Sequence, residues 1–161
     1  MAILASAFDL PPGRLLGLDL GEARIGVAVC DEQGILATPL TVVLRSTRTA
    51  DFAALAALIR RERALGVLAG LPLAAQGELG PQARWARRYA GRLAAALPVP
   101  LAFWDESYST VDAAALLAEG RGRSRLDAAG RSSLDAAAAS VILTDYLAAR
   151  RARDGGIRGD P

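Results

Sequence analysis

Residues 14–44 read RLLGLDLGEARIGVAVCDEQGILATPLTVVL, and this stretch decides the fold. Three apolar runs are separated by two turn signals, one at Gly21-Glu22 and one at residues 31–34. Short runs joined by tight turns predict three strands in an antiparallel meander. Pro39 places the third strand at a sheet edge or a bulge, because proline has no N–H for the ladder. The predicted strands are residues 14–20, 24–30 and 35–44.

After the meander the apolar spacing changes to that of alternating helices and strands. Ser46 or Thr49 is expected to cap the first helix. The order predicts an α/β domain with a five-stranded mixed sheet, an antiparallel three-strand meander plus two parallel strands, and helices on both faces. The predicted elements are a helix to about residue 63, a strand over 66–72, a helix over 80–96, a strand over 99–106, and helices over 109–120 and 132–150.

The composition excludes several kinds of chemistry. The chain of 161 residues has no histidine and a single cysteine, Cys30. A histidine general base, a Ser-His-Asp triad, the usual zinc sites and an intramolecular disulfide are therefore excluded. The net charge is only +2, and every basic residue is arginine. Hydrolytic chemistry would have to use carboxylates, hydroxyls or a hard cation such as Mg²⁺ or Mn²⁺.

The length indicates one domain. We expect an N-terminal extension over residues 1–13 that is frayed or loosely docked, a domain over residues 14–149, and a disordered tail over residues 150–161. Residues 5–7 resemble a signal cleavage site, but a basic leader is lacking. No apolar run approaches the ~20 residues that span a membrane, so the expected location is the cytoplasm.

Acidic residues end two of the predicted strands. Asp19 ends the first strand, and Asp105 and Glu106 end the last. Ligands bind at the carboxyl ends of parallel strands, and crowded carboxylates are stable mainly when a cation neutralises them. This pattern favours a metal site, although an acid can also end a strand simply to be solvated. Asp135 has a second reading as a helix cap, because Ser132 precedes it at the spacing of a capping box.

The turn between the first two strands suits a phosphate. Gly21 permits a tight turn and close backbone approach, and Gly26 keeps the neighbouring strand thin. Arg24 can point across the turn at an anion. A similar turn occurs in the phosphate site of sugar-kinase and actin-like ATPases, and an ordinary hairpin is the simpler alternative.

Four motifs in order resemble the YqgF family, ribonuclease-H-like Holliday junction resolvases and pre-16S rRNA nucleases. They cover about residues 14–148, and together they are specific. The family's Arg after the acid pair is Ser107 here, and its Lys before Arg24 is Ala23. Both differences remove positive charge that could bind a phosphate, and they leave the three acids unchanged. The matching segments are DLGEARIGVAVCDEQGILATPL, GLPLAAQGELGPQA, DESYST and SSLDAAAASVIL.

The resemblance implies a ribonuclease-H-like fold and hydrolysis of nucleic acid with Mg²⁺ or Mn²⁺, in a two-metal site. By position, Asp19, Glu106 and Asp135 are the implied metal ligands and catalytic residues, and Asp105 could replace its neighbour Glu106. A metal-activated water would attack the phosphorus in line, which needs no side-chain base.

Binding of nucleic acid is expected to use arginines. Arg24 lies beside the acids, and a basic loop precedes the last helix. Such a loop can follow a phosphate backbone without reading sequence, although a solvated basic loop is a common alternative. Tyr108 is the candidate for base stacking. The loop arginines are Arg121, Arg123, Arg125 and Arg131.

The expected function is metal-dependent cleavage of phosphodiester bonds, with 5′-end maturation of pre-16S rRNA placed slightly ahead. The alternatives are a Holliday-junction or single-stranded DNA nuclease in recombination or repair, and a nucleic-acid-binding protein without catalysis. A kinase-like ATPase is disfavoured because it usually needs two such domains. Symmetric junction cleavage generally requires a dimer, whereas RNA trimming does not, so a monomer and a homodimer both remain open.

Overall fold

The computed structural model describes residues 2–71, 80–105 and 128–157, without the side chains of residues 128–133 and 157. Its five strands form one sheet in the order β3-β2-β1-β4-β5. β1 pairs antiparallel with β2 and β2 with β3, whereas β1–β4 and β4–β5 are parallel. The predicted meander and mixed sheet are therefore confirmed. The strands are β1 (Leu15–Leu20), β2 (Arg24–Cys30), β3 (Ala37–Leu44), β4 (Gly66–Leu71) and β5 (Leu101–Asp105).

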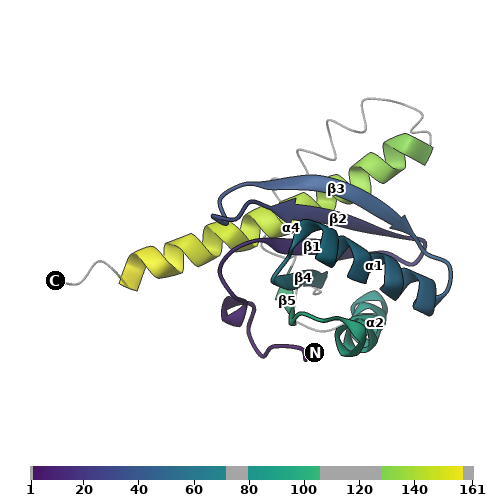
Figure 1. The fold of residues 1–161 in the computed structure, drawn as a ribbon, viewed down its shortest axis with the longest axis horizontal. Coiled ribbons are helices and arrows are strands. Elements are labelled where there is room, and N and C mark those ends of the chain that lie inside the picture. Colours follow the sequence, from purple (N-terminus) through teal and green to yellow (C-terminus); the bar gives the residue numbers. More distant parts are fainter. Residues whose placement is uncertain (1, 72–79, 106–127, 158–161) are drawn as a thin grey trace.

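Helices cover both faces of the sheet, as predicted. Figure 1 shows α1 and α2 on one face and α4 crossing the other face and extending past it. In the part of the chain that the structure describes, the helices are α1 (Arg48–Glu62), α2 (Pro81–Ala96), α4 (Ala128–Ile157) and a short 3-10 helix, η1 (Ala7–Asp9).

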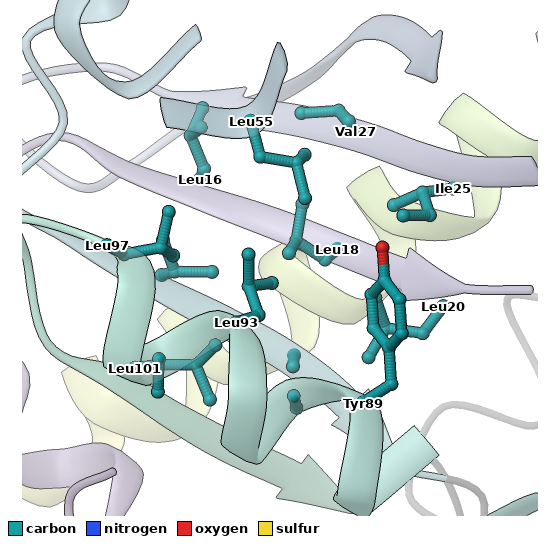
Figure 2. Close-up of a cluster of buried hydrophobic side chains, with 14 of the residues drawn as sticks. Leu16, Leu18, Leu20, Ile25, Val27, Leu55, Tyr89, Leu93, Leu97 and Leu101 are labelled. Atoms are coloured by element: carbon teal, nitrogen blue, oxygen red, sulfur yellow. The ribbon is translucent and has the colours of Figure 1, made fainter. Parts of the chain in front are cut away.

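The alternation along β1 divides its side chains between the two faces. Leu16, Leu18 and Leu20 are buried in the cluster against α1 and α2 (Figure 2). Leu15 belongs to the cluster under α4. Because successive strand side chains point to opposite faces, Asp19 lies on the α4 face. This alternation decides which helix can contribute to a site with it.

Pro39 has the effect that the sequence predicted. β3 is an edge strand, and its register with β2 shifts so that Val27 is opposite Thr41 and Ala28 is opposite Pro39. The skipped residue marks a bulge at the proline, where no ladder hydrogen bond can be donated.

The cap of α1 differs from the prediction. Thr47, rather than Ser46 or Thr49, is the N-cap, and its Oγ1 accepts a hydrogen bond of 3.2 Å from the backbone N–H of Ala50. The helix ends where Arg63 adopts a left-handed conformation. The three hydroxyl residues are close in sequence, and only the geometry of the chain entering the helix selects among them.

The final helix is longer than predicted at both ends. α4 begins at Ala128, so Asp135 lies about two turns inside the helix and is not a cap. The end of the predicted basic loop, residues 128–131, is helical too. At the other end the helix continues to Ile157, which corrects the disordered tail for residues 150–157. At the N-terminal end the two alanines at 128 and 129 favour helix ahead of the capping pattern. At the C-terminal end Arg150 and Arg151 attach the helix to the domain by donating to the carbonyl oxygens of Pro11 and Gly34.

The N-terminal extension is docked and not frayed. The backbone N–H of Leu4 donates to the carbonyl oxygen of Leu101 at 2.8 Å. The Tyr146 hydroxyl on α4 donates to the carbonyl oxygen of Ala7 at 2.9 Å. The extension therefore closes the outer edge of the sheet at β5 and the space beneath α4.

The predicted helix over residues 109–120 lies outside the described residues. Within the described ranges, no helix combines the length and the apolar character that crossing a membrane requires.

Candidate active site

Asp19 is the next-to-last residue of the central strand β1, and its side chain is partly buried. Its neighbour across the antiparallel ladder is Gly26 on β2. An atom at the Cβ position of Gly26 would collide with the carbonyl group of Asp135. Because glycine has no side chain, the backbone of α4 can contact the sheet beside Asp19. Two acids that are far apart in sequence meet for this reason.

Asp135 is held by an arginine of the sheet. The Nε of Arg24, the first residue of β2, donates to Oδ2 of Asp135 at 2.8 Å. Arg24 does point toward an anion, as the sequence suggested, but the anion here is the protein's own carboxylate. Sequence reasoning missed this pair because the two residues are 111 positions apart.

The two carboxylates carry more negative charge than Arg24 balances. Burial raises the pKa of Asp19 to about 6, and the nearby Asp135 carboxylate adds to the rise. Within the described part of the chain, the Asp19 carboxylate accepts no hydrogen bond, whereas Asp135 has Arg24. Ionising Asp19 therefore places a charge where desolvation and a like charge both oppose it. A cation would relieve both penalties.

The turn that joins β1 and β2 is tight, as predicted. The N–H of Gly21 donates to the carbonyl oxygen of Arg24 at 3.0 Å. A Cβ at Gly21 would lie 2.5 Å from that same oxygen, so glycine is required for this approach. The turn sets the end of β1 and the start of β2, and with them Asp19 and Arg24.

A second arginine fastens this turn to the rest of the domain. The backbone N–H of Arg45 donates to the Ala23 carbonyl at 3.0 Å, and its Nη1 donates to the Glu22 carbonyl at 2.8 Å. Its guanidinium lies 4.9 Å from the ring centre of Trp85 and 4.6 Å from that of Tyr89. Cation–π contact and packing thereby hold the turn against α2.

Asp51 is the buried counter-charge of Arg45. Its side chain is 1% exposed, and Oδ2 lies 3.4 Å from the Arg45 Nε. Oδ1 accepts a hydrogen bond from the Ser46 N–H at 2.9 Å, and the Tyr89 hydroxyl donates to Oδ2 at 3.3 Å. Burial, and then the Asp51 charge, raise the pKa of Tyr89 to about 12, so the hydroxyl stays protonated. Sequence reasoning missed Arg45 and Asp51, since an acid in the first turn of a helix is ordinary.

Asp105 lies on the wrong face to join Asp19. It is opposite Leu71 in the ladder, and Leu71 is buried against α1 and α2. Phe103, two residues earlier, packs on the same cluster.

Several predicted site residues lie outside the described residues. The described ranges hold no group of three or more acids, histidines or cysteines placed to bind a metal ion. They contain two of the three predicted acids, Asp19 and Asp135. The backbone of Arg131 lies in α4, and its side chain is outside the description. The others outside are Glu106, Ser107, Tyr108, Arg121, Arg123 and Arg125.

The donor set near Asp19 fits a hard divalent cation. Carboxylate oxygens are the ligands that Mg²⁺ and Mn²⁺ prefer, and the excess negative charge at Asp19 supplies the electrostatic driving force. Zinc is a poorer match without histidine or cysteine nearby. The described residues therefore suit the metal that the sequence implied.

A cavity of about 680 Å³ opens elsewhere, beside Gly13 and Arg14 at the start of β1. Arg14 forms an ion pair of 3.6 Å with Glu62, and Arg61 also pairs with Glu62 at 3.2 Å. Asp19 lies at the opposite end of the strand. The cavity therefore does not mark the site.

The sheet order, the crossing helix and the acid on the central strand define a ribonuclease-H-like domain. The fold is similar to that of T. thermophilus RuvC in complex with Holliday junction substrate, with a TM-score of 0.55 and 23% identity, covering 86% of this chain and 96% of that chain. It is also similar to the yeast mitochondrial Holliday junction resolvase Ydc2, with a TM-score of 0.55 and 12% identity, covering 90% and 82%. The ribonuclease-H-like fold implied by the sequence is confirmed.

The chain belongs to the family described as "RuvX: Holliday junction resolvase", which matches residues 13–149. Similar proteins named "Putative pre-16S rRNA nuclease" occur in Anaeromyxobacter sp. (strain Fw109-5), 45% identical over 145 residues, and Picosynechococcus sp., 38% identical over 142 residues. These alignments cover 86% and 88% of this chain and 99% and 96% of the relatives. The resemblance drawn from the four motifs is confirmed, and it places the chain among hydrolases acting on phosphodiester bonds.

Proposed function

We propose that this protein cleaves nucleic acid with Mg²⁺ or Mn²⁺ held by Asp19, Glu106 and Asp135. The observation that carries the proposal is the convergence of Asp19 and Asp135 at Gly26, with a pKa of about 6 for Asp19 and one arginine between two carboxylates. Such an arrangement weakens the metal-free protein locally and favours binding of a cation. A purely structural cluster would be balanced in charge.

The third ligand is assigned to Glu106 rather than Asp105. The support is the register of β5, which places Asp105 level with Leu71 on the opposite face from Asp19. Glu106 is two residues after Trp104, which packs on the α4 side, so the alternation of strand side chains would give both residues the same face. The assignment agrees with the family motif carried over by position.

Bound divalent cations would supply an activated water at neutral pH and stabilise the departing oxygen. The residues of the chain have separate tasks. Asp19 presents its carboxylate from a rigid central strand, and Asp135 does so from a helix locked against Gly26. Arg24 orients Asp135 through Nε, which leaves its terminal nitrogens as donors for a backbone phosphate. Arg45 keeps the turn carrying Arg24 in place.

The proposed substrate is the 5′ region of pre-16S rRNA, and the support is the name shared by the curated relatives. That role places the protein in the cytoplasm with RNA as its partner, and a monomer would be sufficient. The family description instead favours a four-way DNA junction, whose symmetric cleavage requires a homodimer. Single-stranded DNA in repair is a further candidate substrate.

A cleavage assay tests the proposal. The purified protein is incubated with Mg²⁺, Mn²⁺ or EDTA and with single-stranded RNA containing the pre-16S 5′ region, single-stranded DNA or a four-way junction. We expect metal-dependent RNA cleavage that Asp135→Asn lowers by about 100-fold or more. Asp154→Asn is the matched control, because Asp154 is an exposed carboxylate on the same helix. It should cleave like wild type.

The other outcomes discriminate the alternatives. Preferential, symmetric cutting of the junction would assign the protein to recombination. Binding of nucleic acid without cleavage in either metal would make it a non-catalytic binding protein. Equal cleavage by wild type and Asp135→Asn would remove Asp135 from the site.

A further inference from the structure

The outer face of α2 carries only positive charges. The helix has four arginines, all exposed, and no acidic residue between Pro81 and Ala96. Its opposite face is buried against the sheet through small and apolar residues. The four arginines are Arg84, Arg87, Arg88 and Arg92.

The stability of an isolated helix does not explain this face. Arg84 stands near the N-terminus, where the helix dipole favours acids, and no acid occupies the first turn. Arg84 with Arg88, and Arg88 with Arg92, are like-charged pairs four residues apart, each destabilising by about 0.2–0.5 kcal/mol. The arrangement is one that an external polyanion would stabilise.

The arginines of α2 differ from those beside the site. Arg24 and Arg45 are each paired with a carboxylate, Asp135 and Asp51 respectively. None of the four α2 arginines forms an ion pair with any residue that the structure describes. Toward the residues that the structure describes, their guanidinium groups donate no hydrogen bond, and this leaves their donors available to an outside partner on that side.

α2 and the candidate active site share one edge of the sheet but lie on opposite faces of it, because α2 packs on the face opposite α4 and its Trp85 and Tyr89 contact Arg45 at that edge. A strand bound along α2 would reach Asp19 by passing over this edge. β1 and β4 are parallel, so both end at the same edge of the sheet, where Asp19 lies. α2 connects the parallel strands β4 and β5, so the chain returns from that edge along it, and Figure 1 shows it on the same face of the sheet as α1. Arg84, Arg88 and Arg92 follow one another in steps of about 6 Å along the helix axis. This spacing is comparable to that of successive phosphates in an extended strand.

We propose that the arginine face of α2 binds the sugar-phosphate backbone of a single nucleic-acid strand on one side of the cleaved bond. The inference rests on the proposed function, because it takes the polyanion to be the substrate. An anionic membrane is a poorer match, since the exposed positions of α2 carry arginine, glutamine, alanine and one proline and lack the large apolar side chains of a membrane-surface helix. The contact would add affinity without reading sequence.

The test measures binding apart from cleavage. Fluorescence anisotropy in EDTA follows RNA oligonucleotides of about 5 and about 30 nucleotides over a range of salt concentrations. The variant is the triple substitution Arg84→Gln, Arg88→Gln and Arg92→Gln. The matched control removes the same charge from exposed, unpaired positions of α1 and its C-terminal cap, by Arg48→Gln, Arg60→Gln and Arg63→Gln.

We expect the α2 triple variant to bind the long RNA at least 10-fold more weakly at low salt, with the slope of log Kd against log salt reduced by about 2, which is three contacts at about 0.7 each. Affinity for the short RNA and the cleavage rate constant at saturation should stay near wild type. The control should keep the wild-type slope. The α2 variant should melt no lower than wild type, because like-charge repulsion is removed.

An unchanged slope in the α2 variant would overturn the inference, and so would an equal loss in the control. If the α2 variant lost binding to anionic vesicles while its binding of RNA stayed intact, the face would be assigned to a membrane, and the inference would be overturned as well. Failure of the proposed function has a different signature. In that case the long RNA still binds through α2 in EDTA, but no substrate is cut when Mn²⁺ is added.

Discussion

Two arginine–carboxylate pairs lie at the same end of the sheet, on opposite faces, and they differ in charge balance and enclosure. Arg45 and Asp51 are 19% and 1% exposed, and aromatic rings cover the guanidinium. Arg24 and Asp135 are 34% and 31% exposed, and a second carboxylate, Asp19, lies beside them. The first pair is balanced and closed, whereas the second leaves a negative charge facing a partly open surface. The difference separates a framework pair from a site with room for a cation and a substrate.

Removing the buried member of the framework pair should have the largest effect on stability. Asp51→Ala leaves the Arg45 guanidinium without its counter-charge and the Ser46 N–H and Tyr89 hydroxyl without their acceptor. We expect the free energy of unfolding in urea to fall by about 3–5 kcal/mol. Asp135→Ala, at the exposed pair, should lower it by less than about 1 kcal/mol. Similar losses for both variants would contradict the distinction.

The close approach of α4 to the sheet involves the Arg24–Asp135 pair and not the Arg45–Asp51 pair, and a side chain at position 26 would prevent it. In Gly26→Ala the new methyl group would meet the Asp135 backbone, so α4 must shift. Overpacking of this kind destabilises by about 1–3 kcal/mol or more, and cleavage should fall as Asp135 moves away from Asp19. Gly155→Ala, at an open position of the same helix, is the control and should gain about 0.5–1 kcal/mol. Normal activity in Gly26→Ala would show that the approach is dispensable.

Charge imbalance predicts that removing Asp19 stabilises the metal-free protein. Folding raises the pKa of Asp19 from 3.8 to about 6, so the folded state holds this proton more tightly than the unfolded state. The resulting penalty is absent below pH 3.8, grows between pH 3.8 and 6, and is full above pH 6. After allowance for its partial exposure, Asp19→Asn should gain about 2 kcal/mol at pH 8 in EDTA and nothing near the acid limit. A pH-independent difference in urea unfolding would refute the imbalance.

The smallest effect is expected from a substitution that keeps the charge of Arg45. Arg45→Lys preserves the attraction to Asp51 but loses the fork that also reaches the Glu22 carbonyl. We expect a loss of about 1 kcal/mol in stability and a decrease in kcat with little change in KM, because the turn carrying Arg24 loosens. Steady-state kinetics at saturating RNA would detect it. A change in KM alone would instead place Arg45 in substrate binding.

The fold could be predicted from local patterns because helices and strands each have a characteristic spacing of apolar residues in the sequence. The alternation in the meander and the proline in the third run were sufficient to place β3 at the edge. The start of α4 was not predictable in the same way. The spacing of Ser132 and Asp135 indicated a cap, but the helix begins at Ala128 and passes through it. A capping pattern states where a helix can begin, and the preceding residues decide whether it does.

The candidate site was predicted only in part. Asp19, Asp135 and Arg24 carried recognisable signals in strand ends, the last helix and the turn. Their mutual arrangement did not, because the Arg24–Asp135 pair depends on a helix more than a hundred residues away packing over Gly26. The Arg45 and Asp51 pair likewise requires α2 to bring Trp85 and Tyr89 over it.

The most direct test of the central claim is a comparison of wild type and Asp19→Asn in a Mn²⁺-dependent cleavage assay, after urea unfolding has established that both are folded. The account predicts that the variant, although at least as stable as wild type at pH 8, loses cleavage by a factor of about 1,000 or more. Undiminished metal-dependent cleavage by pure, folded Asp19→Asn would contradict it.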